Sequence, residues 1–466
     1  MSYRKSQDTQ GFWELFFALR RALGEFLLVP TLVIAGFLVL AFITYLVDST
    51  RVEWVVPIRE VLRKRVFANS EATTGLLESI AGGIITLTSI TISLLLVAVQ
   101  QSAGSMTGQV FDQFLRRRMN QIYFGFFVGL ALFSLITLAT VNEPFNPVIG
   151  ASTAFVGAVI ALYLLIILFY TTIHQMRPDE IIRAIHEHIL VARERQIAFI
   201  ARTRPSSEMQ GGVSVPVFSK GHGYVTRVNL DLLEEELSGV TAEVTLLVSI
   251  GTFVAYGDKV AVVRASAAAT AQRIADNFMR ALELEHERDI GLDPAYGISQ
   301  LETIAWTSIS TSKSNPAPGL SVIRALRDVL SRWSEEEPPV PEKGVLQLIY
   351  HDNTFETLFD AFENLAVVSS ESLQHQNFTE IARTFAISFD RLPEDRLKRA
   401  EDLILRILSV LGEFALTREL ELSLKELRTV LEKAGREEVS RAVGRALEQM
   451  SRTIGYLGSR ATRTGE

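Results

Sequence analysis

The sequence contains no cysteine, and this excludes disulfide bridges, thiolate zinc sites and a cysteine nucleophile together. Proline is also scarce, at 14 of 466 residues, which argues against a largely disordered chain. The formal net charge of −7 is too close to neutral for a protein that binds nucleic acid by neutralising phosphates. We therefore expect several folded domains and no nucleic-acid partner.

Charge is also missing locally, from four long segments, residues 26–47, 79–111, 119–142 and 144–176. About 20 apolar residues in a helix cross the hydrocarbon core of a bilayer, which is about 30 Å thick. We predict four transmembrane helices, and their ranges are Phe26–Val47, Leu76–Ala103, Gln121–Val141 and Val148–Ile173. Because only residues 142–147 separate the last two, these helices should form an antiparallel hairpin.

The first span starts too far into the chain, and is too long, for a cleaved signal peptide. Before it, residues 1–25 carry apolar side chains at helical spacing, which predicts an interfacial helix, although the early turns of a long first helix explain the same pattern. Lysine and arginine near the spans are more frequent on the side of both termini. We expect a multi-pass protein of the bacterial inner membrane with cytoplasmic termini, embedded in the lipid bilayer.

The fold class that follows is an α-helical membrane protein with a cytoplasmic α+β region. Four short β-branched segments predict a small barrel-like β module, with strands at 213–218, 223–228, 242–250 and 259–263. The module resembles the barrel-sandwich domain of lipoyl and membrane-fusion proteins. No lysine flanked by aspartate or methionine occupies a hairpin tip, so neither lipoyl nor biotin attachment is supported, and we expect no cofactor.

Helical patterns dominate the rest of the chain, at 268–287, 295–312, 320–333, 354–369, 371–389, 393–411, 416–434 and 436–454. An acidic, proline-rich stretch at residues 335–343 interrupts them and marks a boundary. The predicted domains are an N-terminal interfacial helix (1–25), a transmembrane domain (26–175), a connecting helix and linker (176–210), the β module (211–265), a helical subdomain (266–334), the acidic linker (335–343), a C-terminal helical subdomain (344–455) and a flexible tail (456–466).

Three segments carry a family resemblance. They are the second span with its flanks (76–100), the turn Gly223-Tyr224-Val225, and the stretch from Asp293-Pro294-Ala295-Tyr296-Gly297-Ile298 to Ser312-Lys313-Ser314-Asn315-Pro316. Over most of residues 20–430 the chain resembles the bacterial predicted membrane proteins grouped as domain-of-unknown-function family 2254. In that family the last segment usually reads nearer Ser-Pro-Gly-Ile-Asn-Asp-Pro, so this chain departs from it at the acidic position. The resemblance implies a membrane topology and no activity.

The second span carries a polar stripe, because Gly82, Thr86, Ser89, Ser93 and Gln100 share one helix face, with Leu96 interrupting the stripe. One interpretation is a water-facing pore lining at the axis of a homo-oligomer. The other is a small-residue face that packs against another helix without transport. Glu78, at the outer end, is either a cation-attracting mouth residue or a solvated carboxylate favoured by the helix dipole. No span contains a buried charged residue, which argues against coupled transport.

A second candidate site is a possible ligand loop, formed by Asp293, Tyr296, Ser312 and Asn315 at predicted helix N-termini. Ordinary helix capping explains the same residues. His186 and His188 are two residues apart and therefore point to different helix faces, so we expect no metal. No catalytic motif is present, and nothing in the sequence argues for an enzyme.

Two functional hypotheses remain. The first is an oligomeric passive channel or pore lined by the second span. The second is a membrane-anchored sensor or scaffold whose cytoplasmic domain binds a protein partner or a small ligand.

Overall fold

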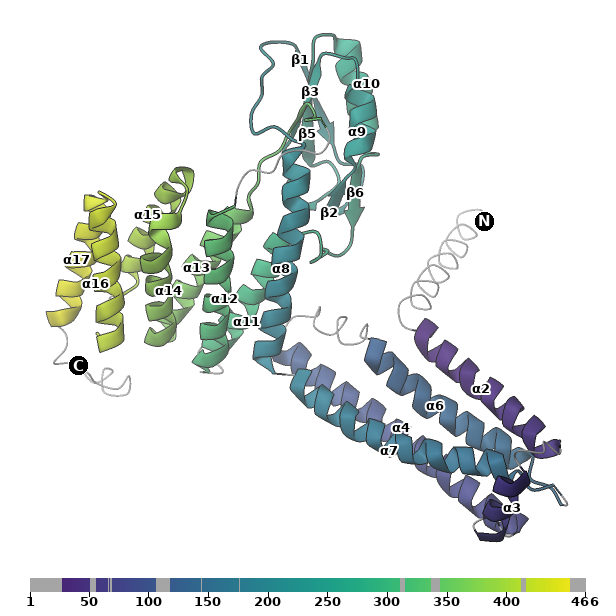
Figure 1. The fold of residues 1–466 in the computed structure, drawn as a ribbon. Helices are drawn as coiled ribbons and strands as arrows, with labels where there is room; N and C mark the ends of the chain where they lie inside the picture. The colour runs from purple at the N-terminus through teal and green to yellow at the C-terminus, as the bar shows by residue number, and fades with distance from the viewer. Residues whose placement is uncertain are drawn as a thin grey trace, which may run out of the picture. The chain divides into compact units, whose positions relative to one another are not determined.

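A computed structural model describes residues 27–50, 56–65, 67, 69–105, 118–143, 145–175, 177–310, 315–336, 344–411 and 416–452. The chain divides into two compact units, Met1–Arg177 and Pro178–Glu466 (Figure 1). The predicted N-terminal interfacial helix, the C-terminal tail and residues 337–343 of the acidic linker lie outside the described residues.

The first unit contains the four predicted membrane helices, α2 (Leu28–Ser49), α4 (Ser70–Ser105), α6 (Arg118–Ala139) and α7 (Val148–Gln175). All four are long and apolar enough to cross a membrane, which confirms the four spans. A short helix that was not predicted, α3 (Val56–Arg65), lies at the end of the unit where α2 ends (Figure 1). With 36 residues, α4 is about 54 Å long and exceeds the thickness of a hydrocarbon core.

Glycines allow the membrane helices to approach closely. A Cβ added at Gly129 of α6 would lie 2.4 Å from Phe37 Cδ2 of α2, and one at Gly125 would lie 2.9 Å from the Cα of Pro30. Between α6 and α7, a Cβ at Gly157 would lie 2.6 Å from Leu130 Cδ1. Since lipid tails are as apolar as the helices, this close packing is a main source of helix association in a membrane.

The second unit starts with α8 (Pro178–Ala201) and continues into a β region. Its strands are β1 (Val213–Phe218), β2 (Gly223–Val228), β3 (Ala242–Leu246), β4 (Phe253–Val254), β5 (Lys259–Ala265), β6 (Leu282–Glu285) and β7 (Leu348–Ile349). They form two separate sheets, in the orders β1-β5-β3-β7 and β4-β2-β6. The barrel-like expectation was wrong, because neither sheet closes on itself.

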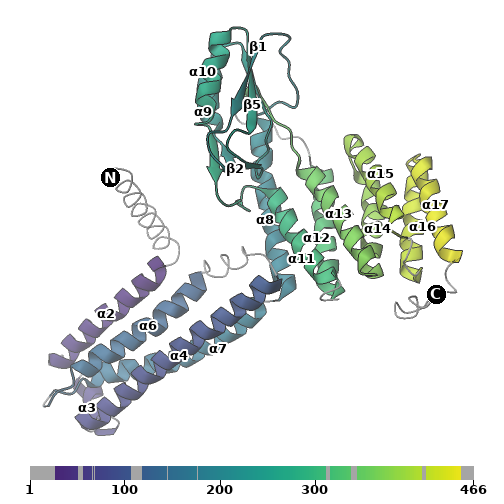
Figure 2. The same ribbon diagram turned by 180° about the vertical axis from the view of Figure 1, so that it is seen from behind.

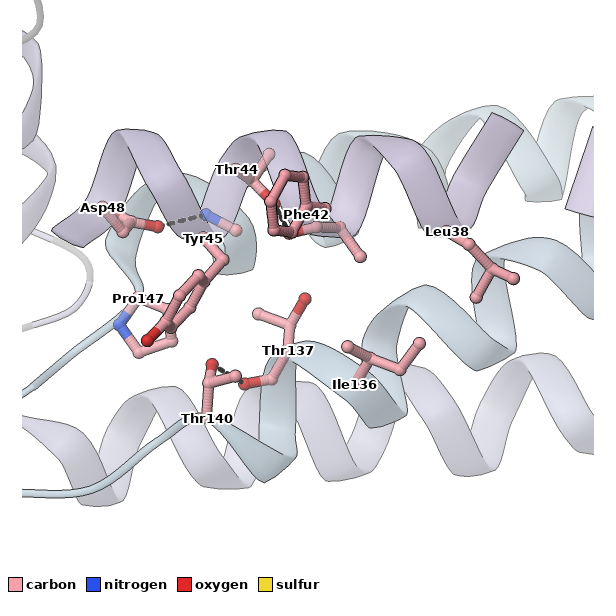
Figure 3. Close-up of a pocket in the computed structure, with 11 residues that line it drawn as sticks. Leu38, Phe42, Thr44, Tyr45, Asp48, Ile136, Thr137, Thr140 and Pro147 are labelled. Atoms are coloured by element: carbon pink, nitrogen blue, oxygen red, sulfur yellow. Dashed lines mark hydrogen bonds between the residues drawn. The ribbon is translucent and has the colours of Figure 1, made fainter. Parts of the chain in front are cut away.

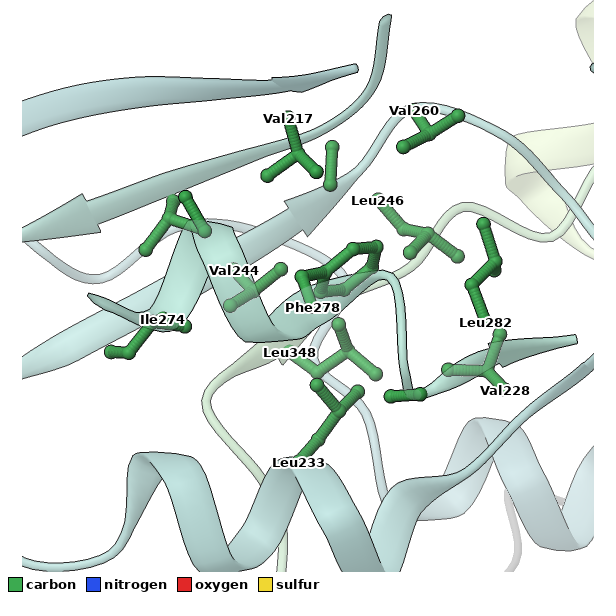
Figure 4. Packing of buried hydrophobic residues seen from close by; sticks show 14 of the residues in the cluster. Val217, Val228, Leu233, Val244, Leu246, Val260, Ile274, Phe278, Leu282 and Leu348 are labelled. Carbon is green, nitrogen blue, oxygen red and sulfur yellow. The ribbon is translucent and has the colours of Figure 1, made fainter. Parts of the chain in front are cut away.

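Helices cover the apolar face of the larger sheet, so burial does not require closure. Two helices, α9 (Leu230–Leu237) and α10 (Ala268–Phe278), supply Leu233, Ile274 and Phe278 to a core that also contains Val244 and Leu246 (Figure 4). The predicted helix at 268–287 was therefore too long. It ends at Phe278, and residues 282–285 form β6, which pairs antiparallel with β2.

The remaining helices stack in two rows. They are α11 (Pro294–Ile309), α12 (Pro316–Ser334), α13 (Thr354–Glu371), α14 (His375–Ser388), α15 (Glu394–Ser409), α16 (Arg418–Lys433) and α17 (Glu437–Arg452). One row runs α11, α13, α15, α17 and the other runs α12, α14, α16 (Figure 2). The helices on the two sides of the acidic linker pack together, since α12 contacts α14. After the linker, and before α13, the chain forms β7, which pairs with β3. The linker therefore interrupts one continuous array of helices instead of separating two helical bodies.

Candidate functional site

The second span, α4, packs one side against the membrane unit. Its buried residues recur at helical spacing and include Thr73, Leu77, Ile80, Ala81, Ile84 and Thr91. These side chains contact α6 and α7. A helix advances by about 100° per residue, so the predicted stripe, centred on Gly82, lies on the opposite side of the helix.

The stripe residues whose side chains the structure describes are exposed. Gly82, Thr86, Ser89 and Ser93 are all exposed, and a Cβ added at Gly82 would meet nothing within 4 Å. Gln100 belongs to the same face by spacing, but its side chain lies outside what the structure describes. No helix in the described ranges covers this face.

Two hydroxyl groups of the stripe bond back to the backbone of α4. Thr86 Oγ1 donates to the Gly82 carbonyl at 2.8 Å, and Ser93 Oγ donates to the Ser89 carbonyl at 3.1 Å. Such bonds satisfy a hydroxyl without a partner helix. Each hydroxyl oxygen still has lone pairs that can accept a hydrogen bond from water.

Two glutamates extend this face toward the start of α4. Glu78 is exposed, and Glu71, seven residues earlier, is also exposed and lies on the same side of the helix. Glu71 is absent from the sequence-based candidates because it precedes the uncharged segment. Its spacing of seven from Glu78 was the available signal.

A buried carboxylate, contrary to the prediction, lies at the end of the first span. Asp48 belongs to the last turn of α2, and its side chain has no exposed surface. Its Oδ1 accepts from the Ile149 amide at 3.1 Å and its Oδ2 from the Gly150 amide at 2.9 Å. Arg59 of α3 reaches Oδ1 at 3.4 Å and donates to the Val47 carbonyl at 2.6 Å.

Asp48 therefore caps the N-terminus of α7 from a different helix. The first N–H groups of a helix have no partner within it, and a carboxylate is stabilised there by the helix dipole. The uncharged segment ends at Val47, and for that reason the span predicted from the sequence stopped one residue short of this group.

The predicted ligand loop is not a single site. Asp293 caps α11 by accepting from the Tyr296 amide at 3.1 Å, and Asn315 caps α12 by accepting from the Ala317 amide at 3.3 Å. Since α11 has 16 residues and is about 24 Å long, these two caps lie at its opposite ends. Ser312 lies outside the described residues, and capping accounts for both Asp293 and Asn315.

The surroundings of Asp293 belong to a buried structural cluster. Arg288 pairs with the Asp293 carboxylate at 2.7 Å and lies over the Tyr296 ring, 4.6 Å from its centroid. Burial raises the pKa of Asp293 above its usual value, although the Arg288 guanidinium acts in the opposite direction. In the part of the chain that the structure describes, no group of three or more histidine, aspartate or glutamate side chains could hold a metal ion.

Comparison with known families identifies the chain. The family described as "Predicted membrane protein (DUF2254)" matches residues 24–376, more than half of the sequence. The chain belongs to this family. The match confirms the resemblance and supports membrane localisation. In this DUF2254 protein the matched residues include all four spans and end at the start of α14. No curated protein and no solved structure matches the chain.

Proposed function

We propose that this DUF2254 protein is a homo-oligomeric passive channel whose pore is lined by the exposed face of α4. One observation carries the proposal: the polar face lies opposite the packed face, and none of the described residues covers it. The outward side of α4 combines this polar stripe with exposed apolar residues such as Ile85, Ile92 and Leu96, whereas no comparable stripe runs along the described residues of α2 or α7. These two helices expose large apolar or aromatic groups such as Leu32 on α2 and Ile166 and Tyr170 on α7, as expected of surfaces in contact with lipid.

The glutamates at the start of α4 suggest which solutes would pass. In a symmetric oligomer around α4, Glu71 and Glu78 would form two rings of carboxylates at one end of the pore. Rings of acidic side chains favour cations, while hydroxyl dipoles along the wall provide weak sites that allow ions to leave. The stripe contains no titratable side chain, which suits passive conduction better than proton-coupled transport.

The proposal is tested by cation flux into vesicles that contain the purified protein. We expect flux with the natural sequence and a large loss in Ser89→Leu, because leucine replaces a hydroxyl at the pore wall. The matched control is Thr171→Leu on α7, whose hydroxyl bonds to its own helix backbone as those of Thr86 and Ser93 on α4 do. Flux that is absent in the natural protein, or equal in both variants, would contradict a pore at α4.

The acidic mouth has a separate test. Glu71→Gln combined with Glu78→Gln removes both carboxylate rings and leaves the hydroxyl wall unchanged. We expect the preference for cations over anions to fall while conduction persists. If the channel conducts but its selectivity is unchanged, the glutamates are ordinary solvated residues at the start of a helix.

A membrane-anchored scaffold is the second candidate, and the stacked helix rows favour it. Rows of paired helices present extended surfaces that commonly bind proteins. A photo-reactive amino acid at Leu422, which is half exposed on α16, would report such a partner in native membranes. Cross-linking to one defined protein would support a scaffold, and its absence at this and other exposed positions of α14 and α16 would contradict it.

A further inference from the structure

A cavity in the membrane unit lies between α2, α6 and the start of α7. Its volume is about 260 Å³, and its walls include Leu38, Phe42, Tyr45, Ile136 and Thr140 (Figure 3). Three of these side chains, on α2, are 43% (Leu38), 63% (Phe42) and 45% (Tyr45) exposed. Because they lie within a membrane span, the cavity opens toward lipid.

The walls of this cavity are chemically suited to a hydrocarbon chain. Two threonines of the wall, Thr137 in α6 and Thr140 just after its end, already donate their hydroxyls to backbone carbonyls, Thr137 to Phe133 at 2.8 Å and Thr140 to Thr137 at 2.7 Å. Between Leu38 and Asp48 the α2 wall is about 15 Å long, which is half of the hydrocarbon core and therefore one leaflet. Part of a single acyl chain fits these dimensions and this chemistry.

The polar end of the cavity is next to a basic helix. Asp48 lies there, with both oxygens occupied by the amides of α7. Arg59 anchors α3 beside it, and α3 carries four basic residues, Arg59, Arg63, Lys64 and Arg65, against the single acidic Glu60. The Arg59 side chain is 24% exposed, and its Nε is buried with no hydrogen-bond partner among the described residues.

We propose that this cavity holds one acyl chain of an anionic phospholipid, whose phosphate lies against Arg59 and the basic helix α3. The apolar cavity is continuous with the lipid-facing surface, which selects a lipid tail as occupant. The excess of positive charge on α3 selects an anionic headgroup, because each lysine or arginine near a membrane surface attracts such lipids. Arginine also recognises phosphate by charge-assisted hydrogen bonds. The site does not depend on whether α4 lines a pore.

The test uses an indole placed in the cavity by Phe42→Trp, in full-length protein reconstituted into phosphatidylcholine vesicles. A small fraction of the lipid is either brominated phosphatidylglycerol or brominated phosphatidylcholine, and bromine quenches nearby indole fluorescence. The signal of the natural tryptophans is subtracted with the parent protein. We expect stronger quenching by the phosphatidylglycerol. Phe155→Trp, 52% exposed on α7 and outside the cavity, is the control, and there both lipids should quench equally.

Two further variants separate the headgroup from the tail. In the Phe42→Trp background, Arg59→Gln should reduce the preference for phosphatidylglycerol about fivefold, which corresponds to about 1 kcal/mol. Thr140→Phe fills the cavity while Arg59 remains, and it should abolish the preference even if the Arg59 variant does not fold. Equal quenching by the two lipids at both indole positions, or an unchanged preference in a folded Arg59→Gln protein, would overturn the proposal.

Discussion

Replacing Asp48 by alanine should strongly destabilise the membrane unit. The substitution removes the acceptor for the Ile149 and Gly150 amides and leaves the Arg59 guanidinium without its carboxylate. Because the Asp48 side chain has no exposed surface, water does not readily replace these partners. Asp48 is therefore expected to hold α2, α3 and α7 together.

The magnitude follows from the contacts. Removing one partner of a buried ion pair costs about 3–5 kcal/mol, and we expect Asp48→Ala to lie in this range. Asp48→Asn keeps one acceptor oxygen for the amides and should cost about 1–3 kcal/mol. Because part of the cost is the unpaired Arg59, the double variant Asp48→Ala with Arg59→Met should be more stable than Asp48→Ala alone.

The assay is reversible unfolding of the full-length protein in mixed micelles with increasing SDS, which gives a free energy of unfolding for each variant. Ser49→Ala is the control, since its hydroxyl is exposed and bonds to the Leu46 carbonyl of its own helix, and it should change stability by less than about 0.5 kcal/mol. A loss below about 1 kcal/mol in Asp48→Ala, or no recovery in the double variant, would refute the capping role.

Three predictions concern the second unit. Gly297→Ala places a Cβ 2.4 Å from Ile189 Cγ1 and should lower the free energy of unfolding, measured with denaturant, by about 1–3 kcal/mol. An unchanged free energy of unfolding would show that α8 and α11 separate easily. Arg193→Met removes the guanidinium that lies 2.6 Å from the Asp352 carboxylate, and it should lower the free energy of unfolding by about 3–5 kcal/mol in the same measurement. An unchanged free energy of unfolding would contradict a stabilising ion pair. Burial raises the pKa of Tyr350 from 10.0 to about 12. The neutral phenol is therefore favoured in the folded state, and the stability present below pH 10 should fall by up to about 2.7 kcal/mol as the pH rises to 12. Thermal unfolding across this range should show a smaller decrease in Tyr350→Phe than in the natural protein; the variant keeps the contribution of Tyr296, whose pKa burial also raises.

The membrane spans were predictable because burying charge in lipid is costly, so uncharged segments mark them directly. The helix ends were less predictable. In α4 the polar residues Ser70 and Glu71 continue the helix beyond the uncharged segment, and nothing in hydropathy alone reports this. The stripe on α4 was recognisable from the sequence because helical periodicity alone places Gly82, Thr86 and Ser89 on one face.

The β region depended on contacts that are distant in sequence. β7 pairs in parallel with β3, about a hundred residues earlier, and two residues per strand carry too little pattern to reveal this. β6 did carry a signal, since Leu282-Glu283-Leu284-Glu285 alternates as a strand does, but it directly follows a helical pattern. The cap at Asp48 was not recognisable because its partners are backbone amides of Ile149 and Gly150.

The accessibility of α4 to water tests the central claim most directly. Because the protein has no cysteine, single cysteines from Gly82 to Gln101 can be probed in native membranes with a water-soluble thiol reagent. A pore predicts labelling at Gly82, Thr86, Ser89 and Ser93, with protection at the buried positions between them. Uniform protection along the helix would contradict a water-filled path and leave α4 as a face that meets lipid or another helix.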